Sequence, residues 1–395
     1  MKKRVNLITV AVLMALTGLL TYVVTYSFVS DDFSDQLEIY GSHRSELKTF
    51  FDTLDYIDNN FVGGTDRGTQ AQGAAAGVVE SLGDPWSRYF TPAEFEVYLA
   101  NRKNSIAGIG IETDPEQTGY IYILRVIPGT GAEGAGLLPG DRITHVDGAA
   151  VAEIGYDAAA AMIAGEEFTS VKLTVERPSE GGGSFDADIV RQVIYVDTVT
   201  STIIDGVGII RIKNFNERSD ADFIEHLQNL LDAGVTALVY DVRDNPGGEL
   251  DKLIKILDRI LPEGELVTLR DRSGQTEVYS STAVESVDLP SVTLINKDSV
   301  SAAELFAADL KEFGWTTLVG EATGGKGYAQ DTFRLDDGSG LYLSTMEYFT
   351  SKGISLDGIG LTPDREVLPA EGETPAFDPA ADRQLAAALE VLTGR

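Results

Sequence analysis

The stretch ALVYDVRDNPGGELDKLIKILDRIL, residues 237–261, contains the parts of one α/β unit in chain order. It opens with ALVYDV, an apolar run with the pattern of a buried strand. An Asn-Pro-Gly-Gly turn follows, and after it apolar residues return at spacings of three and four, as on one face of a helix. The residues on that face are Leu250, Leu253, Ile254, Leu257, Ile260 and Leu261. The stretch therefore predicts a strand, a turn and a helix.

The same order of elements returns further along the chain. SVTLIN (291–296) has a strand pattern, AAELFAADLKEF (302–313) a helical one, and TTLVG (316–320) is a second strand pattern. Repeated strand, turn and helix units predict an α/β fold with parallel strands. Sites in such folds gather at the carboxyl ends of the strands, where both turns would lie.

Ser301 and Glu304 stand at the start of the second helix and allow two interpretations. Ser-x-x-Glu before an apolar run is the pattern of a capping box, and the local sequence favours this interpretation. A helix start also offers unpaired N–H groups and positive dipole, which an oxyanion needs. If Asp298 or Ser299 capped the helix instead, the Ser301 hydroxyl would be free to act as a nucleophile.

The NPGG turn, residues 245–248, also allows two interpretations. It is either a tight turn with no further role or a source of a second oxyanion donor. Adjacent glycines let a backbone N–H point inward without steric obstruction. At the end of a neighbouring strand, such an N–H would converge with one from the helix start on a single carbonyl oxygen.

A serine nucleophile needs a base, and the composition leaves few candidates. The chain has no cysteine, and its three histidines, His43, His145 and His226, lie far apart, so we expect neither a metal nor a cofactor. Lys326 in TGGKGYAQ (323–330) has no acidic neighbour, and Gln330 could orient its amine without stabilising the charge. To act as a base, Lys326 needs a pKa lowered by ~3 units, chiefly through burial.

The N-terminus predicts a membrane segment. MKKR precedes 25 uncharged residues, 5–29, and a bilayer-spanning helix needs ~20. The basic flank should stay in the cytoplasm. We therefore expect residues 1–30 to form a cytoplasmic flank and a single-pass signal anchor in the plasma membrane, with the remainder extracytoplasmic. A cleaved signal peptide is the alternative.

The remaining chain divides into segments with different secondary-structure patterns. Residues 31–104 are helical in pattern, 105–190 form a small, mostly β module, 191–366 form the α/β core, and 367–395 are a helical tail. The stretch RPSEGGGS (177–184) is expected to close the β module as a flexible connection. The net charge of −31 argues against nucleic acid as a partner.

Taken in this order, the motifs resemble those of the carboxy-terminal processing proteases, the tail-specific serine proteases. The separation between Ser301 and Lys326, 326 − 301 = 25 positions, matches the family's spacing. Three positions, Ala164, Ala303 and Gly325, depart from the family's usual residues. The matching stretches are GDPWSRYFTPAEF (83–95), GIGIE (108–112), GAEGAGLLPGDRITHVDG (131–148), YDVRDNPGGELD (240–251), SVSAAE (299–304), TGGKGYAQ (323–330) and EYFTSKGISLDGIGLTPD (347–364).

The resemblance implies a crotonase- or Clp-like α/β protease core with an inserted, mainly β PDZ domain and an N-terminal helical segment. It implies that Ser301 is the nucleophile of a Ser-Lys dyad, that Lys326 is its general base, and that Gln330 holds Lys326. It places the oxyanion hole at the N–H groups of Gly248 and Ala302.

The resemblance also implies the partners. The PDZ loop would bind the C-terminal carboxylate of a protein substrate, and the protease would cut tails of extracytoplasmic proteins. The loop residues are Gly108, Ile109, Gly110 and Ile111. A catalytically inactive PDZ scaffold that binds C-termini is the alternative. The flanking helical patterns also suit a homodimer.

Overall fold

The computed structural model describes Met14 and residues 16–22, 44–178, 183–282 and 286–394. Residues 1–75 and 76–395 form two compact units. Most of the predicted anchor, residues 1–30, lies outside the described residues. Within the described ranges, no helix combines the length and the apolar character needed to span a bilayer.

Two helices follow the N-terminal segment, as the periodicity of this region predicts. They are α2 (Arg44–Asn60) and α3 (Arg67–Glu80), the second of which continues past the boundary between the units. Apolar side chains of α2 are exposed, including Phe51 at 52% and Tyr56 at 73%. Residues 31–43 lie outside the described part of the chain.

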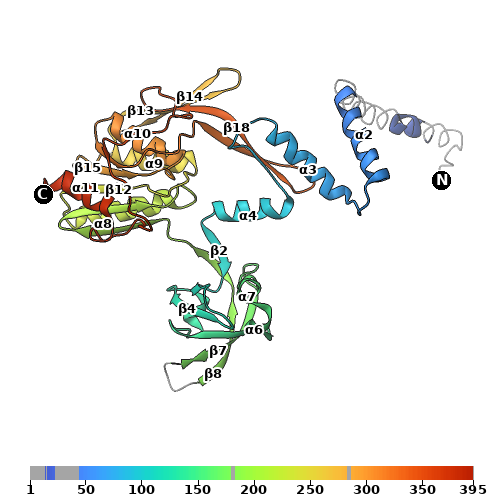
Figure 1. Ribbon diagram of the computed structural model, residues 1–395, viewed down its shortest axis with the longest axis horizontal. Coiled ribbons are helices and arrows are strands. Elements are labelled where there is room, and N and C mark those ends of the chain that lie inside the picture. The colour runs from blue at the N-terminus through green and yellow to red at the C-terminus, as the bar shows by residue number, and fades with distance from the viewer. Residues whose placement is uncertain (1–13, 15, 23–43, 179–182, 283–285, 395) are drawn as a thin grey trace, which may run out of the picture. The chain divides into compact units, whose positions relative to one another are not determined.

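A six-stranded sheet forms the base of the α/β core (Figure 1). The first strand is antiparallel to the second, and all further neighbours are parallel, which confirms the α/β prediction. Of the three strands expected from the sequence, β12 and β15 are buried along their whole length, and β16 is buried over its last three residues. In spatial order the strands are β10 (Val199–Ile204), β11 (Val207–Ile212), β12 (Ala237–Asp241), β15 (Ser291–Ile295), β16 (Thr316–Gly320) and β19 (Arg365–Glu366).

Helices pack on the sheet and form two apolar clusters with it. The larger cluster joins the sheet to three helices and to a second, antiparallel sheet. The smaller cluster joins the other side chains of the sheet to the last helix. The three helices are α8 (Ser219–Asp232), α9 (Leu250–Ile260) and α10 (Ala302–Glu312), and the last helix is α11 (Arg383–Thr393).

The second sheet brings sequence-distant segments to the site. Its central strand β18 pairs on one side with the short strand β1 and along its length with β17, which directly follows the TGGKG loop. The strands are β1 (Arg88–Phe90), β18 (Gly340–Phe349), β13 (Gly264–Asp271), β14 (Thr276–Ser281) and β17 (Tyr328–Arg334). The N-terminal GDPWS segment is therefore held next to the TGGKG loop.

The mostly β module has its own buried core. Contrary to expectation, RPSEGGGS does not end the module, because β8 pairs with β7 along its full length, and residues 179–182 between them lie outside the described part. The elements are β3 (Ile111–Asp114), β4 (Ile121–Val126), α5 (Gly131–Gly134), β5 (Arg142–Val146), β6 (Ala149–Ala150), α6 (Val151–Ile154), α7 (Tyr156–Ile163), β7 (Ser170–Arg177) and β8 (Gly183–Val190).

Two short antiparallel strands connect the module to the core. β2 (Ser105–Gly108) leads in from α4 (Pro92–Arg102), and β9 (Gln192–Tyr195) leads out, with Ser105 paired to Tyr195. Asn104, just before β2, is buried with φ +46° and exchanges amide hydrogen bonds of 3.0 and 3.1 Å with Asn214 of the core. The two ends of the module are thus fixed side by side.

A buried ion-pair cluster fixes the C-terminal segment to the sheet. Arg243, at the end of β12, bonds to both Asp241 and Asp382 at 2.7 Å and is 1% exposed. Asp382 also caps α11 by accepting from the Leu385 N–H at 3.0 Å. The segment expected as a helical tail is therefore helical only over α11 and belongs to the core.

Replacing Asp382 with alanine should destabilise the protein by about 3–5 kcal/mol. The change leaves the buried Arg243 with one carboxylate partner and removes the helix cap. Chemical denaturation measures the loss. Glu390→Ala removes an exposed pair on the same helix and should cost about 1 kcal/mol or less; equal losses for the two variants would contradict the role given to Asp382.

Candidate active site

Ser301 lies at the sharp turn between β15 and α10. Its backbone has φ +61° and ψ −119°, which non-glycine residues adopt rarely and at a cost in energy. Ser301 is itself the N-cap residue of α10, so the alternative in which Asp298 or Ser299 takes this position is not found in the structure. The hydroxyl of Ser299 instead donates to the carbonyl of Val242 at 2.8 Å. Ser301 thus begins the helix and also lines a cavity.

The NPGG turn packs directly against Ser301. A side chain on Gly247 would come within 2.8 Å of the Ser301 Cβ, and one on Gly248 within 2.5 Å of the backbone of Phe215. Phe215 donates to the Gly247 carbonyl and accepts from the Glu249 N–H, at 2.9 and 2.8 Å. The N–H of Gly248, between these two bonds, therefore points away from Phe215.

Two backbone N–H groups beside Ser301 make no hydrogen bond with any described residue. They belong to Gly248 and Ala302, and both residues line the same cavity as Ser301. Unpaired donors next to a hydroxyl nucleophile are what stabilises the oxyanion of an acyl-transfer reaction. The arrangement is therefore suited to this chemistry.

Asn245 holds the two turns together. Its side chain is fully buried, accepts from the Gly247 N–H at 2.8 Å and donates to the Ile212 carbonyl at 2.8 Å. Its own carbonyl accepts from the Val300 N–H at 3.0 Å. One residue thus fixes both the glycine turn and the residue before Ser301.

Lys326 lies in the wall of the same cavity and is 7% exposed. Burial lowers the pKa of its amine to about 8, although the charges of Asp84 and Glu304 oppose this shift. An amine with this pKa is largely neutral in mildly basic solution and can accept a proton. In the described part of the chain, no hydrogen bond joins the Lys326 amine to the Ser301 hydroxyl.

Glu304 links the two loops that carry Ser301 and Lys326. One carboxylate oxygen accepts from the N–H groups of Ser301 and Lys326 at 2.9 and 3.0 Å. The other accepts from the Thr323 hydroxyl and the Gly325 N–H at 2.5 and 2.8 Å. The capping-box pattern predicts only the bond to Ser301, and nothing in the local sequence predicts the other three.

Gln330 is in the cavity wall but does not hold Lys326 in this structure. Its amide donates to the Tyr328 carbonyl at 2.9 Å and to the Ser344 hydroxyl at 3.0 Å. The role that the resemblance gives to Gln330 therefore stays a prediction, and a change of rotamer or of loop position would be needed for it.

Tyr348, on β18, is a site residue that sequence reasoning missed. Its hydroxyl donates to the carbonyl of Lys326. Burial raises the pKa of Tyr348 well above its usual value, so the phenol stays neutral. Its only sequence signal was its place in the stretch that resembles the end of the family's core.

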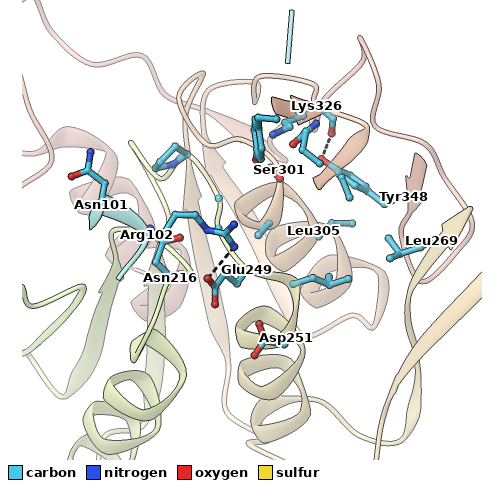
Figure 2. Close-up of a pocket in the computed structure, with 18 of the residues that line it drawn as sticks. Asn101, Arg102, Asn216, Glu249, Asp251, Leu269, Ser301, Leu305, Lys326 and Tyr348 are labelled. Atoms are coloured by element: carbon cyan, nitrogen blue, oxygen red, sulfur yellow. Dashed lines mark hydrogen bonds and ion pairs between the residues drawn. The ribbon is translucent and has the colours of Figure 1, made fainter. Parts of the chain in front are cut away.

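The cavity that these residues line has a volume of about 640 Å³ (Figure 2). One part of its wall is apolar, and another is polar, with the Arg102–Glu249 ion pair at 3.0 Å. The volume and mixed lining suit several residues of a peptide. The apolar wall residues are Leu250, Leu269, Leu305 and Ala329.

A second cavity, of about 790 Å³, is lined by the β module, by the connecting strand β9 and by Thr200 and Lys213 of the core. The four predicted loop residues, Gly108 to Ile111, all line it. Its charged wall residues balance in sign: Arg125 and Lys213 are matched by Glu112 and Asp197, and Arg125 pairs with Glu112 at 2.6 Å. Gly110 has φ +92° and packs against Thr130 so closely that a side chain would collide at 2.2 Å. The loop conformation thus depends on glycine at this position.

Comparisons with known proteins agree with this architecture. Residues 206–367 match the model of peptidase family S41, and residues 122–177 match a PDZ domain. The carboxy-terminal processing protease CtpA of Bacillus subtilis is 32% identical over 82% of this chain and 69% of its own length. The carboxyl-terminal-processing protease of a Picosynechococcus species is also 32% identical, over 82% of this chain and 79% of its own.

Solved structures give the same assignment. The photosystem II D1 C-terminal processing protease aligns with a TM-score of 0.50 and 27% identity over 87% of this chain and 90% of its own. A putative S41 protease of Bacteroides fragilis aligns with a TM-score of 0.53 at 18% identity over 85% and 92% of the two chains, which supports the fold.

The α/β core and its PDZ module define a serine peptidase. The chain belongs to peptidase family S41, as a C-terminal processing serine protease with a PDZ domain.

Proposed function

We propose that the protease cuts through a Ser-Lys dyad and that its PDZ groove recruits the C-terminal tail of the substrate. Ser301 is the nucleophile, Lys326 the general base, and the N–H groups of Gly248 and Ala302 form the oxyanion hole. The observation that carries this proposal is one cavity wall that holds a serine, a buried lysine with pKa about 8 and two unpaired N–H groups.

The chemistry follows from these groups. The neutral Lys326 amine takes the proton of the Ser301 hydroxyl as the oxygen attacks the scissile carbonyl. The oxyanion accepts hydrogen bonds from the two N–H groups. The lysine ammonium then gives its proton to the departing amine, which leaves an ester between the substrate and Ser301. Water attacks this ester while Lys326 takes a proton from it, and the ammonium returns the proton to the Ser301 oxygen as the acid product leaves. Gln330 steadies Lys326 during these transfers, for which its amide must leave Ser344.

The recruitment step uses the Gly108 to Ile111 loop. Its backbone N–H groups bind the terminal carboxylate, and the tail extends along the groove as an added strand. Support comes from the place of this loop in the groove wall and from the apolar lining by Ile109 and Ile163. A tail with an apolar last residue and a free carboxylate fits this lining best.

The test compares a flexible peptide with a free C-terminus and the same peptide as its C-terminal amide. We expect amidation to raise KM by about ten- to a hundredfold, because charge-assisted hydrogen bonds are lost, while kcat changes little. Mass spectrometry of the products locates the cut. Binding of both peptides to the Ser301→Ala protein, measured by fluorescence anisotropy, separates recruitment from cleavage; equal affinities would contradict the recruitment step.

We further propose that residues 5–29 anchor the protease in the plasma membrane with the catalytic part extracytoplasmic. The uncharged length of the segment and its MKKR flank support this. The exposed apolar side chains of α2 support a homodimer. Recovery of the full-length protein in the membrane fraction, and its loss from that fraction when residues 1–30 are deleted, checks the anchor.

A further inference from the structure

The Lys326 amine is enclosed by aromatic rings that the catalytic scheme does not use. Its nitrogen lies 5.1 Å from the centroid of the Trp86 ring and 5.9 Å from that of Tyr342. Trp86 belongs to the segment before β1, and Tyr342 to β18. A ring face within about 6 Å attracts a cation and has no comparable attraction for a neutral amine.

A hydrogen-bond network holds the backbone segment that carries Trp86. The carboxylate of Asp84 accepts from the backbone N–H of Trp86 at 3.0 Å and from the Ser87 hydroxyl at 2.5 Å. The Ser87 hydroxyl in turn accepts from the Ser344 N–H on β18 at 3.0 Å. The next residues of the segment pair with β18, Arg88 opposite Tyr342. The backbone is therefore fixed on both sides of Trp86.

The charges of the other groups around Lys326 follow from their side chains and surroundings. Asp84 and Glu304 carry negative charge and favour the ammonium form. Tyr342 and Tyr348 are neutral, because burial raises the pKa of both phenols, and Asp357 acts on Tyr348 from the loop beyond β18. Burial is the largest effect on the Lys326 pKa and opposes the ammonium. The rings and the two carboxylates therefore act against burial.

We propose that Trp86 is a positioning residue for the general base, holding the Lys326 amine over its indole face and stabilising it when it carries the proton. This inference rests on the proposed function, in which Lys326 is the base. Lys326 is neutral before Ser301 attacks and charged once it has taken the hydroxyl proton. The ring therefore interacts more strongly with the state that follows proton transfer, which lowers the barrier rather than strengthening substrate binding.

The pKa of Lys326 distinguishes this role of Trp86 from simple packing. Loss of the ring should lower the pKa of Lys326 by about half to one and a half units, because a stabiliser of the charged form is gone. The acidic limb of the kcat/KM profile should then move to lower pH, and kcat at its plateau should fall severalfold with KM unchanged. A ring that only excludes water would give the opposite sign, since hydration favours the ammonium.

The experiment compares full-length wild type, Trp86→Leu, Trp86→Phe and the control Phe333→Leu. Phe333 lies on β17 in the same sheet and is 44% exposed, so its loss should leave the profile unchanged. We expect the acidic midpoint near pH 8 in the wild type, the lowest midpoint in Trp86→Leu and an intermediate one in Trp86→Phe. An unchanged or raised midpoint in a folded Trp86→Leu protein would overturn the proposal.

A second measurement does not depend on activity. In the Ser301→Ala background, competitive labelling of Lys326 by acetic anhydride at a series of pH values, read by mass spectrometry, gives the pKa of the amine. The Trp86→Leu change should lower that pKa by the same shift, and no shift refutes the positioning role. If Lys326→Met protein still cuts the peptide, the dyad itself fails, whatever the labelling shows, so the two failures are distinguishable.

Discussion

Ser301→Ala protein should lose about five orders of magnitude or more in kcat/KM on a flexible peptide with a free C-terminus. The change removes the attacking oxygen, and no cysteine is present to replace it. It leaves the N–H of residue 301 bonded to Glu304, so the helix start and the melting temperature should stay close to those of the wild type. Initial rates and product masses from purified full-length protein provide the measurement.

Lys326→Met is the matched variant on the base. Methionine keeps most of the buried chain length but cannot accept a proton, so cleavage should fall to the level of the Ser301→Ala protein. The double variant should be no slower, because residues that act as one unit are not additive. Cleavage retained in either purified single variant would show that the two side chains are not the dyad.

Glu304→Gln should reduce kcat by about a hundredfold or more, although residue 304 never touches the substrate. Each carboxylate oxygen accepts from two donors, and an amide can present an acceptor to only one of these pairs. Its NH2 group would face the other pair, so either the Ser301 turn or the Thr323 side of the lysine loop must move. We expect a loss of about 2–4 kcal/mol in the free energy of unfolding as well.

Glu312→Gln is the control for this loss. Glu312 lies on the same helix and accepts from the hydroxyls of Thr350 and Ser351 and from the Lys352 N–H, away from the cavity. It should therefore reduce stability with kcat nearly unchanged. A Glu304→Gln protein that is destabilised to the same degree yet fully active would show that the link between the two loops is structural only.

The positions of the turns could be predicted from the sequence, because buried strands and amphipathic helices have local patterns. The pattern around Val242 and Ile295 placed both turns at the carboxyl ends of parallel strands, and the structure has them there. A local pattern also indicated Glu304, but only for one of its four bonds. The other three donors lie in a loop whose approach depends on the packing of β16 and β17.

The parts that could not be predicted come from elements that meet only in the folded chain. Trp86 reaches Lys326 because β1 pairs with β18, a contact between residues far apart in the sequence. Arg243 is buried because it pairs with Asp382, which lies at the start of α11, 139 positions away in the sequence. The φ of +61° at Ser301 also depends on the glycine turn packed beneath it.

The paired strands β2 and β9 would allow the PDZ domain to be replaced by another domain. Ser105 and Tyr195 face each other in an antiparallel ladder, where partner Cα atoms are about 5 Å apart. A foreign domain whose ends lie equally close can be grafted between them without stretching the core, and a short turn can close the gap when the domain is cut out. Transplanting this contiguous segment would therefore exchange most of the groove wall between relatives, while Thr200 and Lys213 would stay with the core.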